Sequence, residues 1–328
     1  AMNIKLDKFV LAILVAIVVA YFFPQWGIAT SPIPLDTISA VGIALIFFLY
    51  GLKLSPQKLK AGLGNYKLHL LVQACTFLVF PLVVLLFRPL VQNAEHELLW
   101  LSFFFLAALP STVSSSVVMV SIAKGNIPAA IFNASISGII GIVITPLWMG
   151  LFIDDMQTDF DFTEIYMKLV LQILAPVILG LLLQRFWGGF IQKHTKKLTL
   201  FDKSIILLII YKSFATSFTD GVFSGVSLFD LAILVVGVLF LFVLVYMLTG
   251  RIATALGFSI EDRITAQFCG TKKSLVHGTV FSKIIFGGMP GLGLVLLPLM
   301  LFHASQIMII SAIASRFANR EMPNEPAN

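Results

Sequence analysis

Two adjacent lysines stand inside a long apolar stretch of this chain, where hydrocarbon side chains are expected. Lys272 and Lys273 lie in the segment CGTKKS (residues 269–274), near the middle of residues 259–288. A charged side chain at the centre of a bilayer costs at least about 2.5–3.5 kcal/mol on insertion scales, so two in a row do not face lipid. Non-helical backbone at that depth is tolerated only where protein or a water-filled cavity covers it. We therefore expect a broken helix that lines a polar cavity.

A second stretch has the same character. The segment ALPSTVSSS (residues 108–116) interrupts another apolar run with Pro110 and five hydroxyl side chains. It precedes the lysine segment by about half the length of the chain. Two interrupted apolar segments in matching halves are the best sequence indication of a transporter's binding site. The sequence thus predicts a site where two broken helices meet.

The charge of these segments favours an anionic ligand. Lysines that face a cavity attract anions, and the N-termini of broken helices add partial positive charge. No Asp or Glu falls at the middle of an expected span, which weakens a carboxylate proton relay. The alternative for Lys272 is that it snorkels or pairs with a carbonyl. The predicted substrate-binding residues are Thr112, Ser114, Ser115, Thr271, Lys272, Lys273 and Ser274.

Hydroxyl and amide side chains in and near these segments are candidates for an ion site. Their oxygens suit sodium, but helix–helix hydrogen bonds and close packing explain such residues equally well in membranes. Lys212 either adds a second cation to the path or snorkels, and we expect His277 and His303 to make satisfied hydrogen bonds. The predicted ion-binding residues are Ser114, Ser115, Ser116, Asn133, Ser135, Gln73, Thr76 and Gln267.

Enzyme chemistry finds no support in the sequence. It has no H-E-x-x-H, P-loop or nucleophile-elbow motif, no visible nucleophile–base pair and no cluster of soft metal ligands. We expect no cofactor other than an optional sodium ion, and no nucleic-acid partner. Cys75 and Cys269 both fall inside apolar segments, so they imply no disulfide framework.

The elements that position these residues are transmembrane helices. The chain is 59% hydrophobic and 12% charged, whereas soluble domains carry about 25% charged residues. Each expected span is near the roughly 20 residues that a crossing helix needs, and the short loops leave room for a single membrane domain over residues 1–328. The first apolar run is expected to be a retained helix, and Ala1 before Met2 a tag remnant. The ten expected spans are residues 9–23, 36–52, 67–90, 98–124, 127–153, 163–187, 202–222, 228–250, 260–285 and 291–316.

The basic residues predict the orientation. If the N-terminus is cytoplasmic, most of the 22 lysines and arginines fall in cytoplasmic loops, and only Arg88, Lys168 and Lys283 fall on the other side. This positive-inside bias also explains the net charge of +6 and predicts that both termini are cytoplasmic. Five spans in each half is an odd number, so repeated halves would be inverted. We expect a multi-pass, monomeric protein of an inner or plasma membrane.

At its two interrupted segments the chain resembles the bile acid:sodium symporter superfamily, solute carrier family 10. Within it, the chain is most similar to the seventh-member branch and that branch's bacterial relatives. The likeness in length and span pattern covers nearly the whole chain. The matching stretches are VSSSV (113–117), AAIFN (129–133), GIVITPL (141–147), FCGT (268–271) and KSL (273–275).

The resemblance implies an all-α fold of ten helices in two inverted five-helix repeats, with helices 4 and 9 broken and crossing. It implies a panel subdomain at approximately 9–52 and 163–222, and a core subdomain at approximately 67–153 and 228–316. Substrate would bind between them, and their relative movement would give alternating access. The implied function is a secondary active transporter of an organic anion, with sodium coupling left open. The alternative is a non-transporting membrane regulator or sensor.

One departure from the family pattern concerns sodium. Bile-acid-transporting members bind two sodium ions with a glutamate and a glutamine of the ninth helix and an asparagine of the fourth. Here the ninth-helix positions, Gln267 to Lys273, contain no acid, and the fourth-helix position falls near Ser116 or Val117. Our hypothesis is that the ammonium of Lys273 takes the place of one sodium ion. At most one sodium site would then remain, near Ser114–Ser116 and Asn133.

Overall fold

The computed structural model of this chain consists of helices. It describes residues 8–28, 30–54, 57, 60, 62–91, 94–112, 114–153, 162–225, 227–286 and 291–319, with backbone only for residues 94, 95, 114, 153, 162, 192, 222 and 225. Within these ranges the regular structure is α-, 3₁₀- and π-helical, without a strand. A helix satisfies its own backbone hydrogen bonds, as a segment in lipid must. The chain is therefore an all-helical membrane protein, as its composition predicted.

Every segment in which a span was expected contains helical backbone. The third expected span contains a π-helical turn, Cys75–Val79, and another, Val170–Leu174, leads into α10. The α-helices are α1 (Lys8–Phe22), α2 (Leu35–Lys53), α4 (Tyr66–Ala74), α5 (Phe80–Leu85), α6 (Ala94–Ala108), α7 (Ser114–Ile122), α8 (Ile127–Ile153), α9 (Phe162–Leu169), α10 (Ala175–Thr219), α11 (Leu228–Ala255), α12 (Ile260–Gly270), α13 (Leu275–Ile285) and α14 (Leu292–Ala318).

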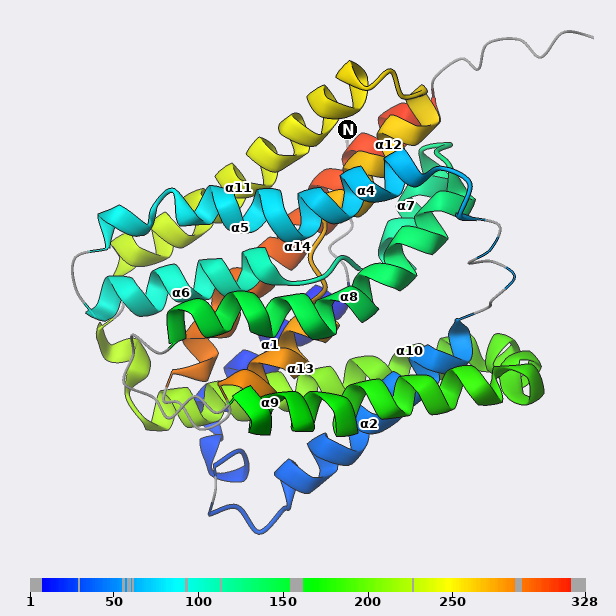
Figure 1. The fold of residues 1–328 in the computed structure, drawn as a ribbon. Helices are drawn as coiled ribbons and strands as arrows, with labels where there is room; N and C mark the ends of the chain where they lie inside the picture. The colour runs from blue at the N-terminus through cyan, green and yellow to red at the C-terminus, as the bar shows by residue number, and fades with distance from the viewer. Residues whose placement is uncertain are drawn as a thin grey trace, which may run out of the picture.

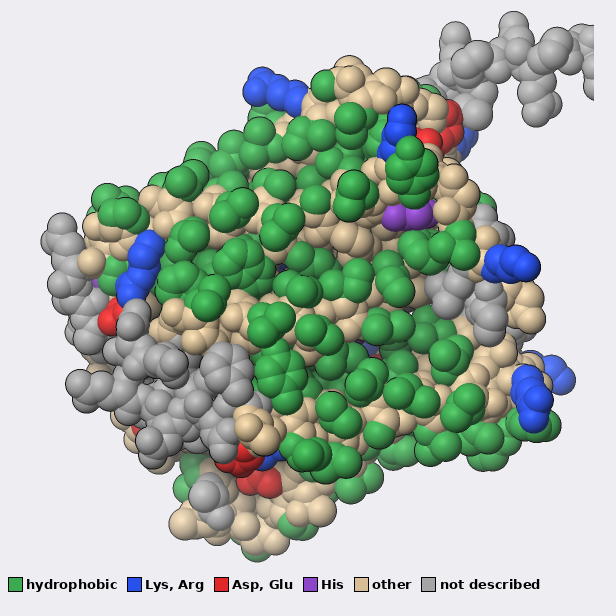
Figure 2. All heavy atoms as spheres, in the orientation of Figure 1, with side chains coloured by type: hydrophobic (Ala, Val, Ile, Leu, Met, Phe, Trp, Pro, Cys, Tyr) green, Lys and Arg blue, Asp and Glu red, His purple; other side chains and the backbone are tan. Residues whose placement is uncertain are grey.

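Six segments of the described chain are long and apolar enough to cross a membrane, and α1 and residues 96–108 are shorter apolar helices. Figure 2 shows one face of the molecule covered largely by hydrophobic side chains, with most lysines and arginines near its edges. This is the distribution expected when an apolar belt faces lipid. The six segments are Leu35–Lys53, Tyr66–Leu90, Ile127–Phe152, Thr163–Ile191, Leu228–Ala255 and Leu292–Ala318.

Both predicted interruptions are present. The first lies between the end of α6 at Ala108 and the start of α7 at Ser114, and the second between the end of α12 at Gly270 and the start of α13 at Leu275. The backbone N–H of Ser274 in the second break donates to the carbonyl of Pro110 in the first, at 2.9 Å. The two breaks therefore lie against each other, as the paired interruptions in the sequence predicted.

The connection between two expected spans, 163–187 and 202–222, is helical, because α10 runs unbroken for 45 residues. This helix is not straight. Gly51 of α2 packs without room for a side chain against the carbonyl of Val177, while Lys53 pairs with Asp202 at 3.2 Å. A straight helix at about 1.5 Å per residue would hold Val177 and Asp202 roughly 37 Å apart. The helix therefore turns back on itself, and Figure 1 shows the turn at the right-hand end.

Figure 1 places the helices in two groups. In this view α1, α2, α9 and α10 lie in the lower part, and α4 to α8, α11, α12 and α14 lie above them. The break between α12 and α13 carries the chain from the upper group toward the lower one. This break thus lies where the two groups meet.

Candidate functional site

Lys273 lies at the crossing of the two breaks, and its surface is completely buried. Its Nζ donates to three backbone carbonyls, at 2.6 Å to Ala107, 2.8 Å to Leu109 and 2.8 Å to Thr76. The same atom lies 4.2 Å from the ring centroid of Phe80. Three acceptors use all the donors of an ammonium group. None of the ion pairs described in this structure involves Lys273, so carbonyl dipoles and a ring face hold its charge.

Local sequence explains why these carbonyls are free to accept. Two of them come at the C-terminal end of α6, where the last carbonyls have no intrahelical partner and carry the negative end of the helix dipole. The third belongs to Thr76 in the π-helical turn, where the N–H of Phe80 bonds to Cys75 instead. Pro81 follows and has no N–H to donate. The carbonyl of Thr76 is therefore left to Lys273.

Gln306 on α14 holds the backbone of the second break. Its Oε1 accepts from the N–H of Lys273 at 2.8 Å, and its Nε2 donates to the carbonyl of the same residue at 2.9 Å. The side chain is fully buried, and its Nε2 also lies 3.1 Å from Nδ1 of His303. The backbone N–H and C=O of Lys273 have no helical partners in the break, and Gln306 supplies the hydrogen bonds that buried backbone groups need.

Lys272 is equally buried but less completely bonded. Its Nζ donates to the carbonyl of Ser115 at 2.9 Å and lies 3.5 Å from the Oγ of the same residue. The longer contact is at the outer limit of a hydrogen bond. Among the described residues, Lys272 thus has one strong acceptor for three donors. Ser115 lines a cavity, so the charge of Lys272 lies directly behind a cavity wall.

The two breaks also share side-chain hydrogen bonds. Ser111 Oγ, in the first break, donates to the carbonyl of Cys269 near the end of α12, at 2.5 Å. Thr76 Oγ1 donates to Val72 at 2.8 Å and lies 3.5 Å from the carbonyl of Gly270. The carbonyls that end α12 thus find donors on other elements, which ties the second break to the π-helical turn after α4 and to the first break.

One face of α8 supports the first break. Ser137 Oγ accepts from the N–H of Ser111 at 3.0 Å, and Thr145 Oγ1 donates to the carbonyl of Ala108 at 2.7 Å. Between them, Gly141 has no side chain and packs against the break. These positions are four residues apart, so they share a helix face. The Ser137 hydroxyl is therefore used in a structural hydrogen bond.

The hydroxyls that begin α7 form a cluster. Thr112 Oγ1 lies 2.8 Å from Ser116 Oγ and accepts from Ser115 Oγ at 2.9 Å. Thr112 and Ser115 line the cavity, whereas Ser116 is fully buried. Ser114 begins α7, and its side chain lies outside the described residues. Two of the predicted substrate-binding hydroxyls on this helix therefore face the same space.

Two more predicted substrate-binding residues stand at the second break. Thr271 Oγ1 donates to the carbonyl of Gln267 at 2.5 Å, so its hydroxyl is used within the end of α12. Ser274 is the N-cap of α13 and accepts from the N–H of His277 at 3.2 Å. Ser274 lines the cavity and Thr271 is not among its lining residues.

Asn133 and Gln73 form a separate amide cluster. Asn133 Nδ2 is hydrogen-bonded to His69 Nδ1 at 2.8 Å and to the carbonyl of Ala129 at 3.0 Å. Gln73 Nε2 donates to Asn133 Oδ1 at 3.2 Å, and Gln73 Oε1 is buried with no partner among the described residues. A buried acceptor without a donor suits a cation or a water molecule. No described hydrogen bond joins this cluster to the hydroxyls of α7.

The remaining predicted residues lie in three different places. Ser135 lines the cavity, and its carbonyl accepts from Tyr50 Oη at 2.6 Å. Gln267 Nε2 donates to a carbonyl of α11 at 3.1 Å. Lys212 forms an ion pair with Asp36 at the start of α2 and is not among the cavity-lining residues.

The cavity has a volume of about 380 Å³ and reaches both breaks. Its polar inner wall carries Thr112, Ser115 and Ser274, at the starts of α7 and α13. Helices α1 and α2 supply an apolar wall that includes Phe9 and Phe47. The N-termini of helices carry partial positive charge, and Lys272 adds a full charge behind the inner wall. This combination suits an anionic group attached to an apolar body.

Charged side chains stand at the exposed end of the cavity. Lys53 and Asp202 form the ion pair described above and are partly exposed, and both line the cavity. Lys203 Nζ lies 4.9 Å from the ring centroid of Phe9, another lining residue. Two lysines and one aspartate leave a positive balance at this end, which favours the approach of an anion.

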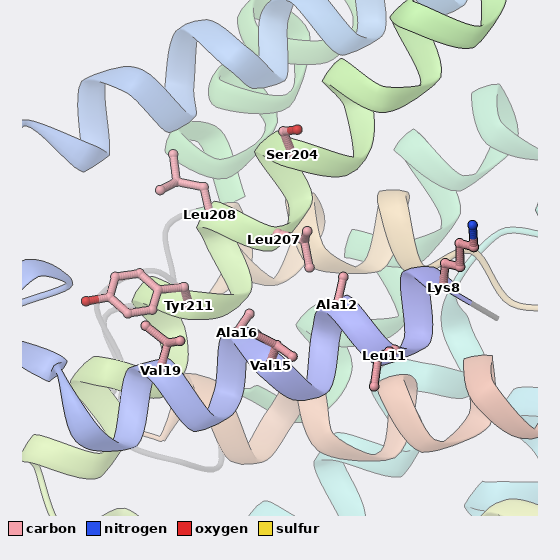
Figure 3. A pocket seen from close by; sticks show the side chains of 10 residues that line it. All are labelled: Lys8, Leu11, Ala12, Val15, Ala16, Val19, Ser204, Leu207, Leu208 and Tyr211. Atoms are coloured by element: carbon pink, nitrogen blue, oxygen red, sulfur yellow. The ribbon is translucent and has the colours of Figure 1, made fainter. Parts of the chain in front are cut away.

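A second hollow, of about 600 Å³, lies between α1 and α10 and differs in chemistry (Figure 3). Its walls are mostly apolar, with Leu11 and Val15 half exposed, and Tyr211 Oη already donates to the carbonyl of Phe23 at 2.6 Å. This groove suits lipid chains and has no cluster of polar groups for an anion. The lining residues are Lys8, Leu11, Ala12, Val15, Ala16, Val19, Ser204, Leu207, Leu208 and Tyr211.

Sequence reasoning missed two parts of the Lys273 site, the π-helical turn and Gln306. Pro81, inside the expected span 67–90, was a signal, because a proline within a helix frees a carbonyl one turn earlier. Gln306, inside the last expected span, was another, because a polar side chain at membrane depth needs a partner. Neither signal identifies the partner, which comes from a distant part of the chain.

The chain is similar to proteins of one family along nearly all of its length. The model of the SBF-like CPA transporter family matches residues 7–319, which include both breaks and the whole cavity. Uncharacterized protein PA2026 of Pseudomonas aeruginosa is 38% identical over 96% of this chain and 93% of its own length. Sodium/bile acid cotransporter 7 of Danio rerio is 31% identical over 95% of this chain and 93% of its own length. The protein of that name in Rattus norvegicus is 30% identical over 95% and 92%.

Proposed function

Because this chain belongs to the SBF-like CPA transporter family, we propose that it is a secondary active transporter that carries an organic anion across the membrane. The family is one of transporters, so the chain is not an enzyme. The observation that carries the anion proposal is the cavity that ends at two helix N-termini, with Lys272 behind Ser115. Half-helix N-termini at the crossing of broken helices are a recurrent way to bind anionic substrate groups in transporters.

The transport step is proposed to be alternating access between two bodies. The panel comprises approximately residues 9–52 and 163–222, and the core approximately 67–153 and 228–316. The chain would cross the membrane ten times, in two inverted five-helix repeats with both termini cytoplasmic. The cavity supports this division, because α1, α2 and α10 form one side of it and α7, α8, α13 and α14 the other. Relative movement of the two sides would open and close it.

We further propose that the ammonium of Lys273 stands where related transporters hold one sodium ion. Three backbone carbonyls around a single positive charge resemble the oxygen ligands of a bound alkali cation, and the ammonium is permanently attached. A remaining sodium site would then use open acceptors elsewhere. Gln73 Oε1, which is buried and unpartnered among the described residues, supports a place near Asn133. Sodium would be cargo there, coupled at no more than one site.

Thermal unfolding of the detergent-solubilised protein tests this function. The midpoint is measured against a panel of organic anions, with sodium or potassium as the only cation. A ligand of the native state stabilises it by about RT ln(1 + [L]/Kd), so binding raises the midpoint. We expect stabilisation by at least one amphipathic anion, and counterflow of that anion in proteoliposomes.

Three results would distinguish sodium-coupled transport, sodium-independent transport and a non-transporting regulator or sensor. Stabilisation only in sodium supports a retained coupling site. Stabilisation that ignores sodium and disappears in Lys272→Met supports an anion transporter with a fixed charge. No stabilisation by any anion, together with no counterflow, would contradict the transport proposal and favour a membrane regulator or sensor.

A further inference from the structure

His277 has a ring nitrogen that the fold leaves without a partner. The side chain is 4% exposed and lines the cavity, and its Nε2 is buried with no hydrogen bond among the described residues. Leaving a buried polar atom unpaired is unfavourable, so such an atom calls for an explanation. The sequence predicted a satisfied hydrogen bond for His277, and Nδ1 makes one with Ser274 at 2.9 Å, whereas Nε2 makes none among the described residues.

The bonds of Ser274 favour one assignment of the ring proton of His277. Ser274 Oγ accepts from the backbone N–H of His277 at 3.2 Å and lies 2.9 Å from its Nδ1. Within the described chain, Nδ1 is the one acceptor within reach of the Ser274 hydroxyl hydrogen. The neutral imidazole then carries its hydrogen on Nε2, because one nitrogen accepts and the other donates. With this assignment, the unpartnered Nε2 is a donor.

Aromatic rings hold this imidazole in place. Its centroid lies 5.3 Å from that of Phe47, 6.0 Å from Tyr50 and 5.8 Å from Phe281, with each pair close to perpendicular. A methyl group added at Gly138 of α8 would lie only 2.9 Å from both Nε2 and Tyr50 Oη. Tyr50 Oη donates to the carbonyl of Ser135, and no described hydrogen bond joins it to Nε2. Among the described residues, the Nε2–H donor has no acceptor.

We infer that His277 binds the substrate, and that Nε2–H donates to an oxygen of its anionic group. This inference rests on the proposed anion transport. The same oxygen-bearing group would face the hydroxyls of Thr112 and Ser115, while the apolar body of the substrate contacts Phe47. The substrate class is an amphipathic anion whose charged group accepts hydrogen bonds, as carboxylates, sulfate esters and phosphate esters do. His277 thus selects for an acceptor oxygen as well as for negative charge.

The test uses two substitutions, of which one keeps a polar group near the position of Nε2 and the other keeps one near the position of Nδ1. His277→Gln places an amide N–H near the position of Nε2. His277→Asn keeps a partner for Ser274 near the position of Nδ1 but does not reach as far. Affinities for octanoate, octyl sulfate and octyl phosphate are taken from the concentration dependence of thermal stabilisation, with 1-octanol as the uncharged control. We expect His277→Gln to stay within about threefold of the wild type, and His277→Asn to weaken anion binding about tenfold.

A second pair of variants covers the case in which a change at His277 prevents folding. Gly138→Ala pushes the imidazole away without removing it and should also weaken binding about tenfold. Gly189→Ala, whose added methyl meets no neighbour, should leave binding unchanged. Equal anion affinity in the wild type, His277→Asn and Gly138→Ala would overturn this inference while leaving anion transport intact. A wild type that binds none of the three anions would overturn both.

Discussion

Lys272 and Lys273 are neighbours in the chain, equally buried, and yet their surroundings differ in kind. Lys273 donates to three carbonyls on two other elements, while Lys272 has one strong acceptor and stands behind a cavity wall. An ammonium whose donors are all used is a structural cation. One with unused donors next to a cavity still attracts an anion. Lys273 thus stabilises the fold, and Lys272, the residue before it, is proposed to attract the substrate.

The comparison is sharpest for a substitution that removes the charge of Lys273 and keeps its length. Lys273→Met leaves three buried carbonyls without donors, and each such loss costs about 1 kcal/mol or more. We expect a loss of about 3 kcal/mol in the free energy of unfolding, measured as a lower midpoint in thermal unfolding. A variant as stable as the wild type would show that the three bonds contribute nothing to the fold.

The next largest effect is expected at Gln306. Gln306→Leu removes both hydrogen bonds that hold the backbone of Lys273, at a cost of about 2 kcal/mol. Gln267→Leu is the matched control, because that buried glutamine makes one described side-chain bond, and it should cost about half as much. Equal losses in thermal unfolding would contradict the role of Gln306 as a clamp on the break.

Lys272 should affect binding more than stability. Lys272→Met removes the positive charge behind Ser115, and anion affinity should fall about tenfold, or about 1.4 kcal/mol. The measurement is the concentration dependence of stabilisation by octanoate. Lys168→Met, which breaks an exposed pair with Glu164, is the control and should leave affinity unchanged. If Lys272→Met binds octanoate as well as the wild type, the division between the two lysines is wrong.

Thr76 should give the smallest effect, because Lys273 uses its backbone carbonyl and not its hydroxyl. Thr76→Val keeps that carbonyl and removes hydroxyl bonds to Val72 and Gly270. We expect less than about 1 kcal/mol of lost stability in thermal unfolding. A loss of stability as large as that of Lys273→Met would mean that the Thr76 hydroxyl, rather than its carbonyl, stabilises the Lys273 site.

The position of this site could be predicted from the sequence, because charged residues within an apolar run strongly indicate a buried polar site. Lys272, Lys273 and Pro110 located both breaks, since neither lipid nor a regular helix accommodates such residues. The bonding of the lysines could not be predicted in the same way. It depends on which carbonyls are free, and these belong to α6 and to a π-helical turn far away in the chain.

Other differences have equally local causes. The sequence predicts Asn133 and Ser116 near one ion site, and in the structure Asn133 is hydrogen-bonded to His69 and Gln73, which no periodicity relates to it. The sequence did not predict that α10 stays helical where it reverses direction, because a polar stretch between two apolar runs is typical of a loop. The unpartnered nitrogen of His277 appears only once all its neighbours are placed.

The most direct test of the central claim is to ask whether sodium can take the place that Lys273 vacates. Lys273→Ala leaves three inward carbonyls and room for a cation, whereas Lys273→Met leaves neither charge nor room. The measurement is the thermal unfolding midpoint of both variants and the wild type in sodium chloride and in choline chloride. The account predicts that sodium raises the midpoint of Lys273→Ala by more than it raises the other two. An equal sodium response in all three proteins would contradict it.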